Sequence, residues 1–261
     1  MTPLTEKSNR VAAAIKLQRP AGRRHAARFL AEGPNLVEAA LRRGLVEEVF
    51  ATEDAHARFA DLLADLLADA PVHEVTERAA KALSDTVTPV GLIAVCEIPE
   101  VALSEVLDAP RLVAVAVETS DPGNAGTLIR LADAMGADAL ILTGDSVDPY
   151  NAKCLRASAG SIFGLPVVQA PDTPEVLAAL RSAGLQVLAT TLDGETPLPS
   201  VDLSLPTAWL LGSEAHGLAP AIAAAADARV RIPMRGSAES LNVAAAAAIC
   251  LYESAQAQSA Q

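Results

Sequence analysis

Two short runs of consecutive apolar residues constrain the fold of this chain more than any other feature. Residues 112–117 read LVAVAV and residues 139–143 read ALILT, with almost no alternation between polar and apolar side chains. Strands that are apolar on both faces are typical of the centre of a parallel sheet that helices cover on both sides. Because parallel strands need crossover helices between them, these runs predict an α/β fold.

The residues that follow position 106 repeat this alternation of strand and helix. We expect an open, mostly parallel sheet with helices on both faces. The predicted strands span 112–118, 138–143, 165–169, 186–190, 207–212 and 229–232. The predicted helices span 125–135, 151–160, 174–183, 218–226 and 240–254, and the tail SAQAQSAQ is expected to be disordered because of its low complexity.

A smaller α/β domain is predicted before this sheet. It begins with a basic helix from Asn9, contains a single helix through ARFADLLADLLADA (residues 57–70), and ends in a β-rich run at 91–98. Residues 97–110 contain two prolines and several acidic residues, so we place the domain boundary there. The predicted domains are residues 1–105 and residues 106–261.

Composition excludes several classes of protein. The chain is 51% apolar and 20% charged, which indicates a folded globule. No run reaches the roughly 18 apolar residues that cross a bilayer, and the N-terminus lacks a signal-peptide pattern. The three cysteines lie far apart without a CxxC pair, so we expect small buried side chains, no disulfide and no metal site. These features predict a cytoplasmic protein without membrane contact.

Charge is unevenly distributed along the chain. The net charge is −12, yet residues 1–43 contain nine basic residues and only three acidic ones. A basic segment on an acidic body is a possible footprint for a phosphate backbone, and its alternative is a solvated helix face that keeps a domain soluble.

Three polar loops follow predicted strands of the second domain, where ligands of open α/β sheets gather. The first contains Gly123, Asn124 and Gly126, with Arg130 further along the helix, although an ordinary strand-to-helix turn could also explain the glycines. The second reads GSEAHGL (212–218) and places a carboxylate between glycines. His216 in this loop has no visible orienting partner, which argues against a general base.

The third loop lies between the strand at 229–232 and the last helix. Glu239, Ser240 and Asn242 cluster at the predicted start of that helix. An alternative interpretation is purely structural, because Ser240 alone could cap the helix.

In this order, the three loops resemble the signature motifs of the SpoU (TrmH-like) family of RNA 2′-O-ribose methyltransferases, within the SPOUT superfamily. The matching positions are Asn124 with Arg130, Gly212 to Leu218, Ile232 to Met234 and Ser240 to Val243. The segment DPYNAKCLRASAGSIFGLPV also looks like the family's stretch between the first two motifs. The resemblance implies S-adenosylmethionine as cofactor, a trefoil knot, and a homodimer with active sites at the interface.

The resemblance also implies roles for individual residues. The catalytic set would be Arg130, Asn124, Glu214, Ser240 and Asn242. In the family, the arginine that matches Arg130 is linked to deprotonation of the ribose hydroxyl; a guanidinium stays protonated, so stabilising the developing alkoxide suits its chemistry better. The cofactor would be held by Leu211, Gly212, Ser213, Glu214, Gly217, Ile232, Met234, Ser240, Leu241 and Asn242.

The first domain resembles the L30e-like substrate-binding domain of family members that act on ribosomal RNA. We therefore expect RNA contacts at Arg10, Arg19, Arg23, Arg24 and Arg28. Ribosomal RNA is the favoured substrate, and the alternatives are a transfer-RNA methyltransferase or a non-catalytic RNA-binding protein. A nicotinamide-dependent oxidoreductase is disfavoured because the G-x-G-x-x-G fingerprint is incomplete.

Overall fold

A computed structural model describes residues 2–259, except for the side chains of residues 66–69. The chain divides into two compact units, which are considered separately. Unit 1 comprises Met1–Glu100 together with Tyr150–Phe163, and unit 2 comprises Val101–Pro149 together with Gly164–Gln261.

Unit 1 is built on a four-stranded sheet of order β1-β4-β2-β3, in which β4 pairs antiparallel with β1 and β2, and β2 pairs parallel with β3. The strands are β1 (Arg28–Glu32), β2 (Val46–Ala51), β3 (Val72–Glu74) and β4 (Leu92–Glu97). The helices are α1 (Asn9–Ile15), η1 (Lys16–Gln18), α2 (Pro20–Ala26), α3 (Pro34–Arg42), α4 (Glu53–Arg58), α5 (Ala60–Asp69), α6 (Glu77–Leu83), α9 (Ala152–Ser158) and η2 (Ser161–Phe163).

The single helix predicted at 57–70 is wrong, because the structure has two helices there. Thr52 caps α4 by accepting a hydrogen bond from the Ala55 amide at 3.2 Å, so helix starts four residues earlier than predicted. Phe59 then leaves the helical region with φ −121° and ψ 33°, which separates α4 from α5.

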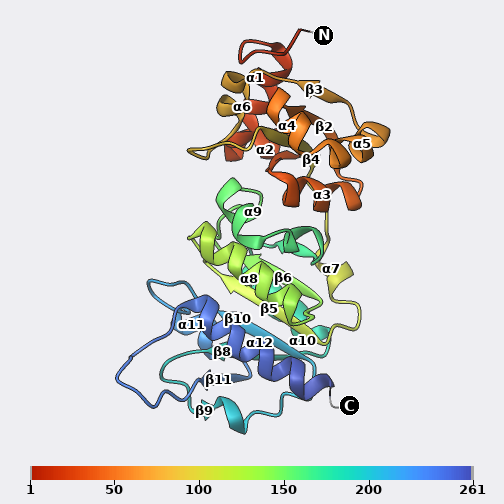
Figure 1. The fold of residues 1–261 in the computed structure, drawn as a ribbon. Coiled ribbons are helices and arrows are strands. Elements are labelled where there is room, and N and C mark those ends of the chain that lie inside the picture. Colours follow the sequence, from red (N-terminus) through yellow and green to blue (C-terminus); the bar gives the residue numbers. More distant parts are fainter. Residues whose placement is uncertain (1, 260–261) are drawn as a thin grey trace. The chain divides into compact units, whose positions relative to one another are not determined.

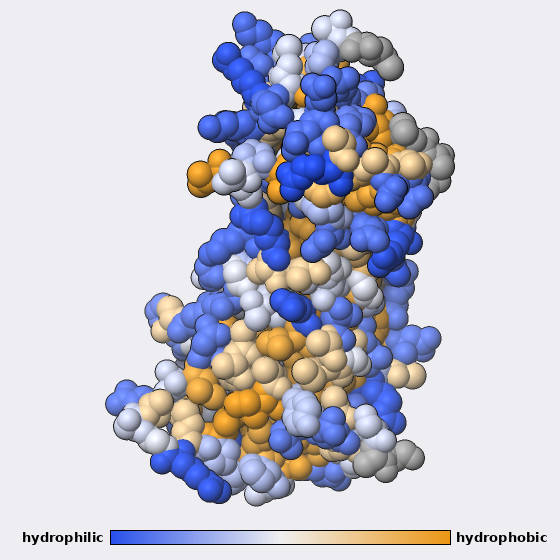
Figure 2. Space-filling view, in the orientation of Figure 1, coloured by the Kyte–Doolittle hydropathy of each residue, from blue (hydrophilic) through white to orange (hydrophobic). Residues whose placement is uncertain are grey.

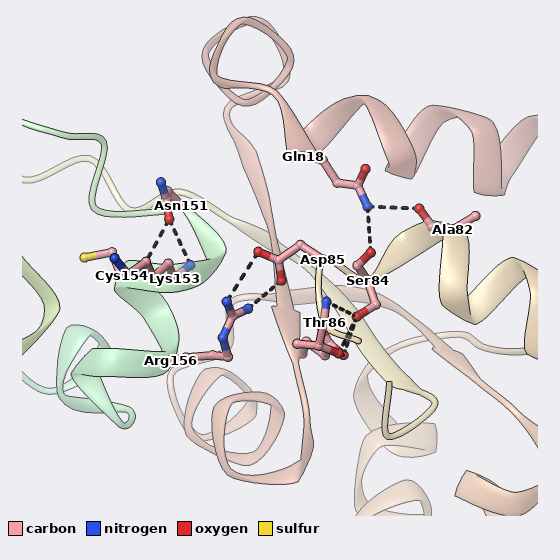
Figure 3. A network of polar contacts seen from close by, with 10 residues as sticks. Gln18, Ala82, Ser84, Asp85, Thr86, Asn151, Lys153, Cys154 and Arg156 are labelled. Atoms are coloured by element: carbon pink, nitrogen blue, oxygen red, sulfur yellow. Dashed lines mark hydrogen bonds and ion pairs between the residues drawn. The ribbon is translucent and has the colours of Figure 1, made fainter. Parts of the chain in front are cut away.

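Residues 150–163 belong to unit 1 although they lie between two strands of unit 2 in the sequence. The Phe29 ring of β1 packs against Tyr150 and Phe163, with centroid distances of 4.9 and 6.1 Å. Arg156 of α9 forms an ion pair with Asp85 (Figure 3). The sequence analysis placed this segment in the second domain; in the structure its aromatic side chains complete the core of the first.

Unit 2 contains a seven-stranded sheet of order β7-β6-β5-β10-β8-β11-β9, in which all recorded pairs are parallel. The strands are β5 (Leu112–Val117), β6 (Ala139–Thr143), β7 (Val167–Gln169), β8 (Gln186–Thr190), β9 (Thr196–Pro197), β10 (Thr207–Leu211) and β11 (Ala228–Arg231). The helices are α7 (Leu103–Val106), α8 (Pro122–Ala134), α10 (Thr173–Ser182), η3 (Leu198–Ser200), α11 (Pro220–Ala224) and α12 (Val243–Ser259).

Helices cover both faces of this sheet (Figure 1). Alternate residues of β5, namely Val113, Val115 and Val117, share an apolar cluster with Val176 and Leu180 of α10. Helices α8 and α12 pack together on the opposite face, where the buried Trp209 of β10 donates a hydrogen bond to Ser254 of α12 at 2.9 Å. The predicted α/β class is therefore confirmed, while the knot stays a prediction.

The prediction of a disordered tail from residue 254 is wrong for the described residues. Helix α12 continues to Ser259, because Ser254 is buried beneath Trp209 and the Gln258 amide donates to the carbonyls of Arg111 and Leu205 at 3.1 and 3.0 Å. Residues 260–261 lie outside the described range. The prediction took low complexity as a sign of disorder. Small side chains such as that of Ser254 instead allow a helix to pack closely.

The three cysteines are free and buried, as predicted. Burial raises the pKa of the Cys250 thiol to about 12 and raises that of Cys96 as well. Among the described residues, no helix is long and apolar enough to cross a membrane.

We expect Ser254→Ala to lower the free energy of unfolding by about 1–3 kcal/mol, because it leaves the buried indole N–H of Trp209 without a partner. Urea unfolding followed by tryptophan fluorescence measures this change. Ser259→Ala is the matched control on the same helix, since the Ser259 hydroxyl is exposed and donates to the Ala255 carbonyl one turn earlier. Equal stability of both variants would contradict this account of α12.

Candidate active site

Four loops of unit 2 meet at one edge of the sheet. Strands β5, β10, β8 and β11 are parallel neighbours in that order, so the loops that follow them emerge on the same side. Three of these loops contain the polar motifs singled out from the sequence, and the fourth follows β8. The register of the sheet thus brings together segments that are up to 118 residues apart in sequence.

A chain of hydrogen bonds joins one side chain from each motif loop. The Asn124 amide donates to a carboxylate oxygen of Glu214 at 2.6 Å, and the Asn242 amide donates to the Asn124 oxygen at 3.2 Å. The structure therefore brings together three of the five residues predicted to be catalytic. We refer to Asn124, Glu214 and Asn242 as the polar triad.

Helix starts fix two members of the triad. Asp121 caps α8 by accepting a hydrogen bond from the Asn124 amide N–H at 2.9 Å, so Asn124 lies in the first helical turn. Asn242 accepts from the Ala244 amide at 2.8 Å, directly before α12 begins at Val243. The alternative in which Ser240 caps this helix is therefore wrong, because the helix starts three residues later than predicted.

A tight turn fixes the third member. Reciprocal backbone hydrogen bonds between Ser213 and Gly217, at 3.1 and 2.9 Å, close the turn that presents Glu214. Gly212 lies so close to the returning chain that a Cβ there would lie 2.3 Å from the Gly217 carbonyl carbon. Gly212 therefore permits a close backbone approach, whereas Gly217 adopts a positive φ of 66° that favours glycine.

A cavity of about 750 Å³ opens beside the triad. Most of the residues predicted to hold a cofactor line it: Gly212, Ser213, Glu214, Gly217, Ile232, Met234, Ser240 and Leu241. The two others do not. Leu211 is fully buried in β10, and Asn242 is turned toward Asn124.

The sequence analysis missed the wall that follows β8. Residues 190–193, together with Arg229 of β11, also line the cavity. The sequence contained a signal for this wall, because TLDG (191–194) follows the predicted strand 186–190, and a loop after a strand of the same parallel sheet emerges at the same edge.

The cavity suits a ligand that is partly apolar and partly polar. Leu192, Met234 and Leu241 line it and remain exposed, at 66, 37 and 39%. The buried Thr191 hydroxyl also belongs to this wall and has no hydrogen-bond partner within the described residues. A nucleoside carrying an amino-acid tail offers a flat apolar ring and hydrogen-bonding groups that match these features.

Within one chain, Arg130 lies away from the polar triad. Six residues beyond Asn124 on α8, its Cα lies about 9 Å further along the helix axis and on a different face. The side chain is exposed and makes no recorded hydrogen bond or ion pair within residues 2–259.

The arginines predicted to contact RNA differ in their surroundings in unit 1. Arg23 is 3% exposed and donates to the Leu17 and Gln18 carbonyls at 2.9 and 3.1 Å, so its prediction as an RNA contact is wrong and its role is structural. Arg10 pairs with Glu48 and Arg28 with Glu47. Arg19 and Arg24 are exposed, and no ion pair is recorded for them among the described residues.

Fold and site together define an α/β protein that binds a nucleotide-like ligand at the carboxyl edge of a parallel sheet. Comparison of the sequence with protein families identifies the family. Residues 111–252 match the family model of the SpoU rRNA methylases, and residues 8–94 match that of the MRM3-like substrate-binding domain. The chain therefore belongs to the SpoU rRNA methylase family, which confirms the resemblance stated from its motifs.

Relatives match nearly the whole chain. The 23S rRNA (guanosine(2553)-2′-O)-methyltransferase RlmP of Bacillus subtilis is 37% identical over 86% of this chain and 87% of its own length. The crystal structure of an AdoMet-bound rRNA methyltransferase from Sinorhizobium meliloti is 31% identical, with a TM-score of 0.87 over 98% of this chain and 97% of that one. The SpoU methyltransferase AviRb from Streptomyces viridochromogenes, in complex with AdoMet, is 31% identical, with a TM-score of 0.85 over 96 and 98%.

Proposed function

We propose that this chain transfers a methyl group from S-adenosylmethionine to a ribose 2′-hydroxyl of 23S ribosomal RNA. The observation that carries the proposal is the cavity beside the polar triad, whose apolar side chains and unpartnered Thr191 hydroxyl fit this cofactor. Relatives named as 23S rRNA 2′-O-methyltransferases support this substrate. Because one of them is named for a guanosine and another for a uridine, the proposal names the ribose hydroxyl and no particular base.

The cofactor, when bound, supplies a methyl group on a positively charged sulfur. The triad then has to position the ribose. Asn124 uses one amide hydrogen for Glu214 and one lone pair for Asn242, which leaves a second N–H and a second lone pair to bind a hydroxyl. Because both neighbours fix the amide, its free groups are already oriented before the ribose arrives.

Arg130 provides the positive charge that the reaction needs. A ribose hydroxyl loses its proton as its oxygen attacks the methyl group, so negative charge develops on that oxygen. A guanidinium remains protonated, and we therefore assign Arg130 to stabilising this charge and to binding a flanking phosphate.

We expect Arg130→Ala to lower kcat by about 10²–10³-fold, because it removes one stabilising donor from the transition state. The Kd for S-adenosylmethionine, measured by calorimetry, should stay within about twofold of the wild-type value. Asp133→Ala, an exposed change on the same helix, is the control and should leave both constants unchanged. Failure of the wild-type protein to bind the cofactor would contradict the proposed function.

The proposal includes a homodimer in which the partner's arginine completes the site. Helix α12 carries an exposed face of Ala245, Ile249 and Tyr252, which recur at intervals of four and three residues. Apolar surface also gathers over α8 and α12 in Figure 2. An apolar helix face of this kind is typical of a protein–protein interface, and a second copy would bring an Arg130 to a triad that lacks one.

Mixing two inactive variants tests this arrangement. If Arg130 and Asn242 of one site come from different protomers, reassembled mixtures of Arg130→Ala and Asn242→Ala should recover about a quarter of wild-type activity, since half of the dimers carry one intact site. Each variant alone is the control. No recovery in a mixture that light scattering shows to be dimeric would contradict the shared site.

Unit 1 supplies the RNA contacts in this proposal. Arg19 and Arg24 are the strongest remaining candidates, because Arg23 is buried and Arg10 and Arg28 already have acidic partners. An unpaired exposed guanidinium can bind phosphate without first breaking an ion pair.

We expect the double substitution Arg19→Gln and Arg24→Gln to weaken RNA binding and to reduce the salt dependence of log K by roughly 0.7–0.9 for each lost phosphate contact. Filter binding across a range of salt concentrations gives this slope. Arg42→Gln is the matched control, because Arg42 is exposed but paired with Glu38 on the same helix. An unchanged slope in the double variant would place the RNA on another surface.

A further inference from the structure

Strand β11 carries two arginines that hold the loop after β8, residues 191–195, which we call the 191–195 loop. Arg231 donates to the carbonyls of Gly194 and Glu195 at 2.7 and 2.8 Å. Arg229 donates to the Glu195 carboxylate at 2.6 and 3.1 Å and to the Asp193 carbonyl at 3.3 Å. Both arginines therefore bind the tip of a loop that walls the cavity.

We propose that Arg231 and Arg229 are positioning residues for cofactor binding, because they fix the 191–195 loop so that Thr191 and Leu192 form a wall of the cavity. The inference rests on the proposed function and adds to it a pair of residues that lie outside the three sequence motifs.

The loop is tied to β11 along its whole length. The Thr191 amide donates to the Val230 carbonyl at 2.9 Å, and β9 pairs with β11 directly after the loop. Between these points Gly194 lies so close that a Cβ there would be 2.7 Å from the Val230 carbonyl carbon. Any side chain at this position would push the loop away from the strand.

The held conformation leaves two groups ready for a ligand. The Thr191 hydroxyl is buried and has no hydrogen-bond partner among the described residues, and Leu192 is 66% exposed although it lines the cavity. A buried hydroxyl without a partner is unfavourable until a ligand bonds to it. The arrangement is therefore preorganised for a ligand with both polar and apolar parts.

The two arginines contribute unequally. Hydrogen bonding to Arg229 lowers the pKa of Glu195, so this pair stays charged, but the Asp193 and Glu195 side chains are 76 and 70% exposed. Solvent and salt weaken exposed ion pairs. The Arg231 bond to the Gly194 carbonyl is partly buried, and neither carbonyl bond of Arg231 depends on a second charge, so Arg231 is expected to have the larger effect.

The test compares Arg231→Met with the wild-type protein. We expect the Kd for S-adenosylmethionine, measured by calorimetry, to rise about tenfold, and amide hydrogen exchange of residues 191–196 to become faster. At saturating cofactor, kcat and the KM for RNA should stay within about twofold, because the triad and the RNA surface are untouched. Gly194→Ala should reproduce the weaker cofactor binding by displacing the same loop.

Arg181→Met is the matched control. Arg181 of α10 also donates to a backbone carbonyl, that of Ala225, and pairs with Asp227 at 3.2 Å, but neither partner lines the cavity. Both methionine variants should lose thermal stability, and only Arg231→Met should change the Kd. An unchanged Kd in Arg231→Met, or an equal change in both variants, would overturn the positioning role. Absence of cofactor binding by the wild-type protein would instead contradict the proposed function.

Discussion

The two hydrogen bonds of the Asn124 side chain, which donates to Glu214 and accepts from Asn242, are the interaction on which the rest of the site depends. They join the loops after β5, β10 and β11, and these loops meet because the strands are parallel neighbours in one sheet. A local structure holds each member of the triad in place. The N-terminal caps of α8 and α12 hold Asn124 and Asn242, and a glycine turn holds Glu214. In the proposed function, these local structures hold the triad in place for the ribose, and the cavity beside it receives the cofactor.

Much of this arrangement could be predicted from the sequence. The apolar runs at 112–117 and 139–143 indicated central parallel strands, and their carboxyl ends located the polar loops. The motif residues Asn124, Glu214 and Asn242 lie within hydrogen-bonding distance, as their shared edge suggests. These features can be predicted because the strands follow from the local apolar pattern, and the position of the loops follows from the geometry of parallel sheets.

Other features depend on packing that no local pattern reveals. Arg23 is as basic as Arg24, yet only the structure shows that its guanidinium bonds the carbonyls of η1 and is buried. The wall at 191–195 depends on Arg229 and Arg231 from a strand more than thirty residues away. The end of α12, from Ser254 onward, has the sequence of a flexible tail, and the hydrogen bond between Ser254 and Trp209 helps to hold it in the helix.

The most direct test of the central claim identifies the atom that is methylated. Ribosomal RNA is incubated with the protein and labelled S-adenosylmethionine, digested to nucleosides and analysed by mass spectrometry. The account predicts one labelled nucleoside from 23S rRNA, with the methyl group on the ribose 2′-oxygen. A label on a base, or no transfer to 23S rRNA by a protein that binds the cofactor, would contradict it.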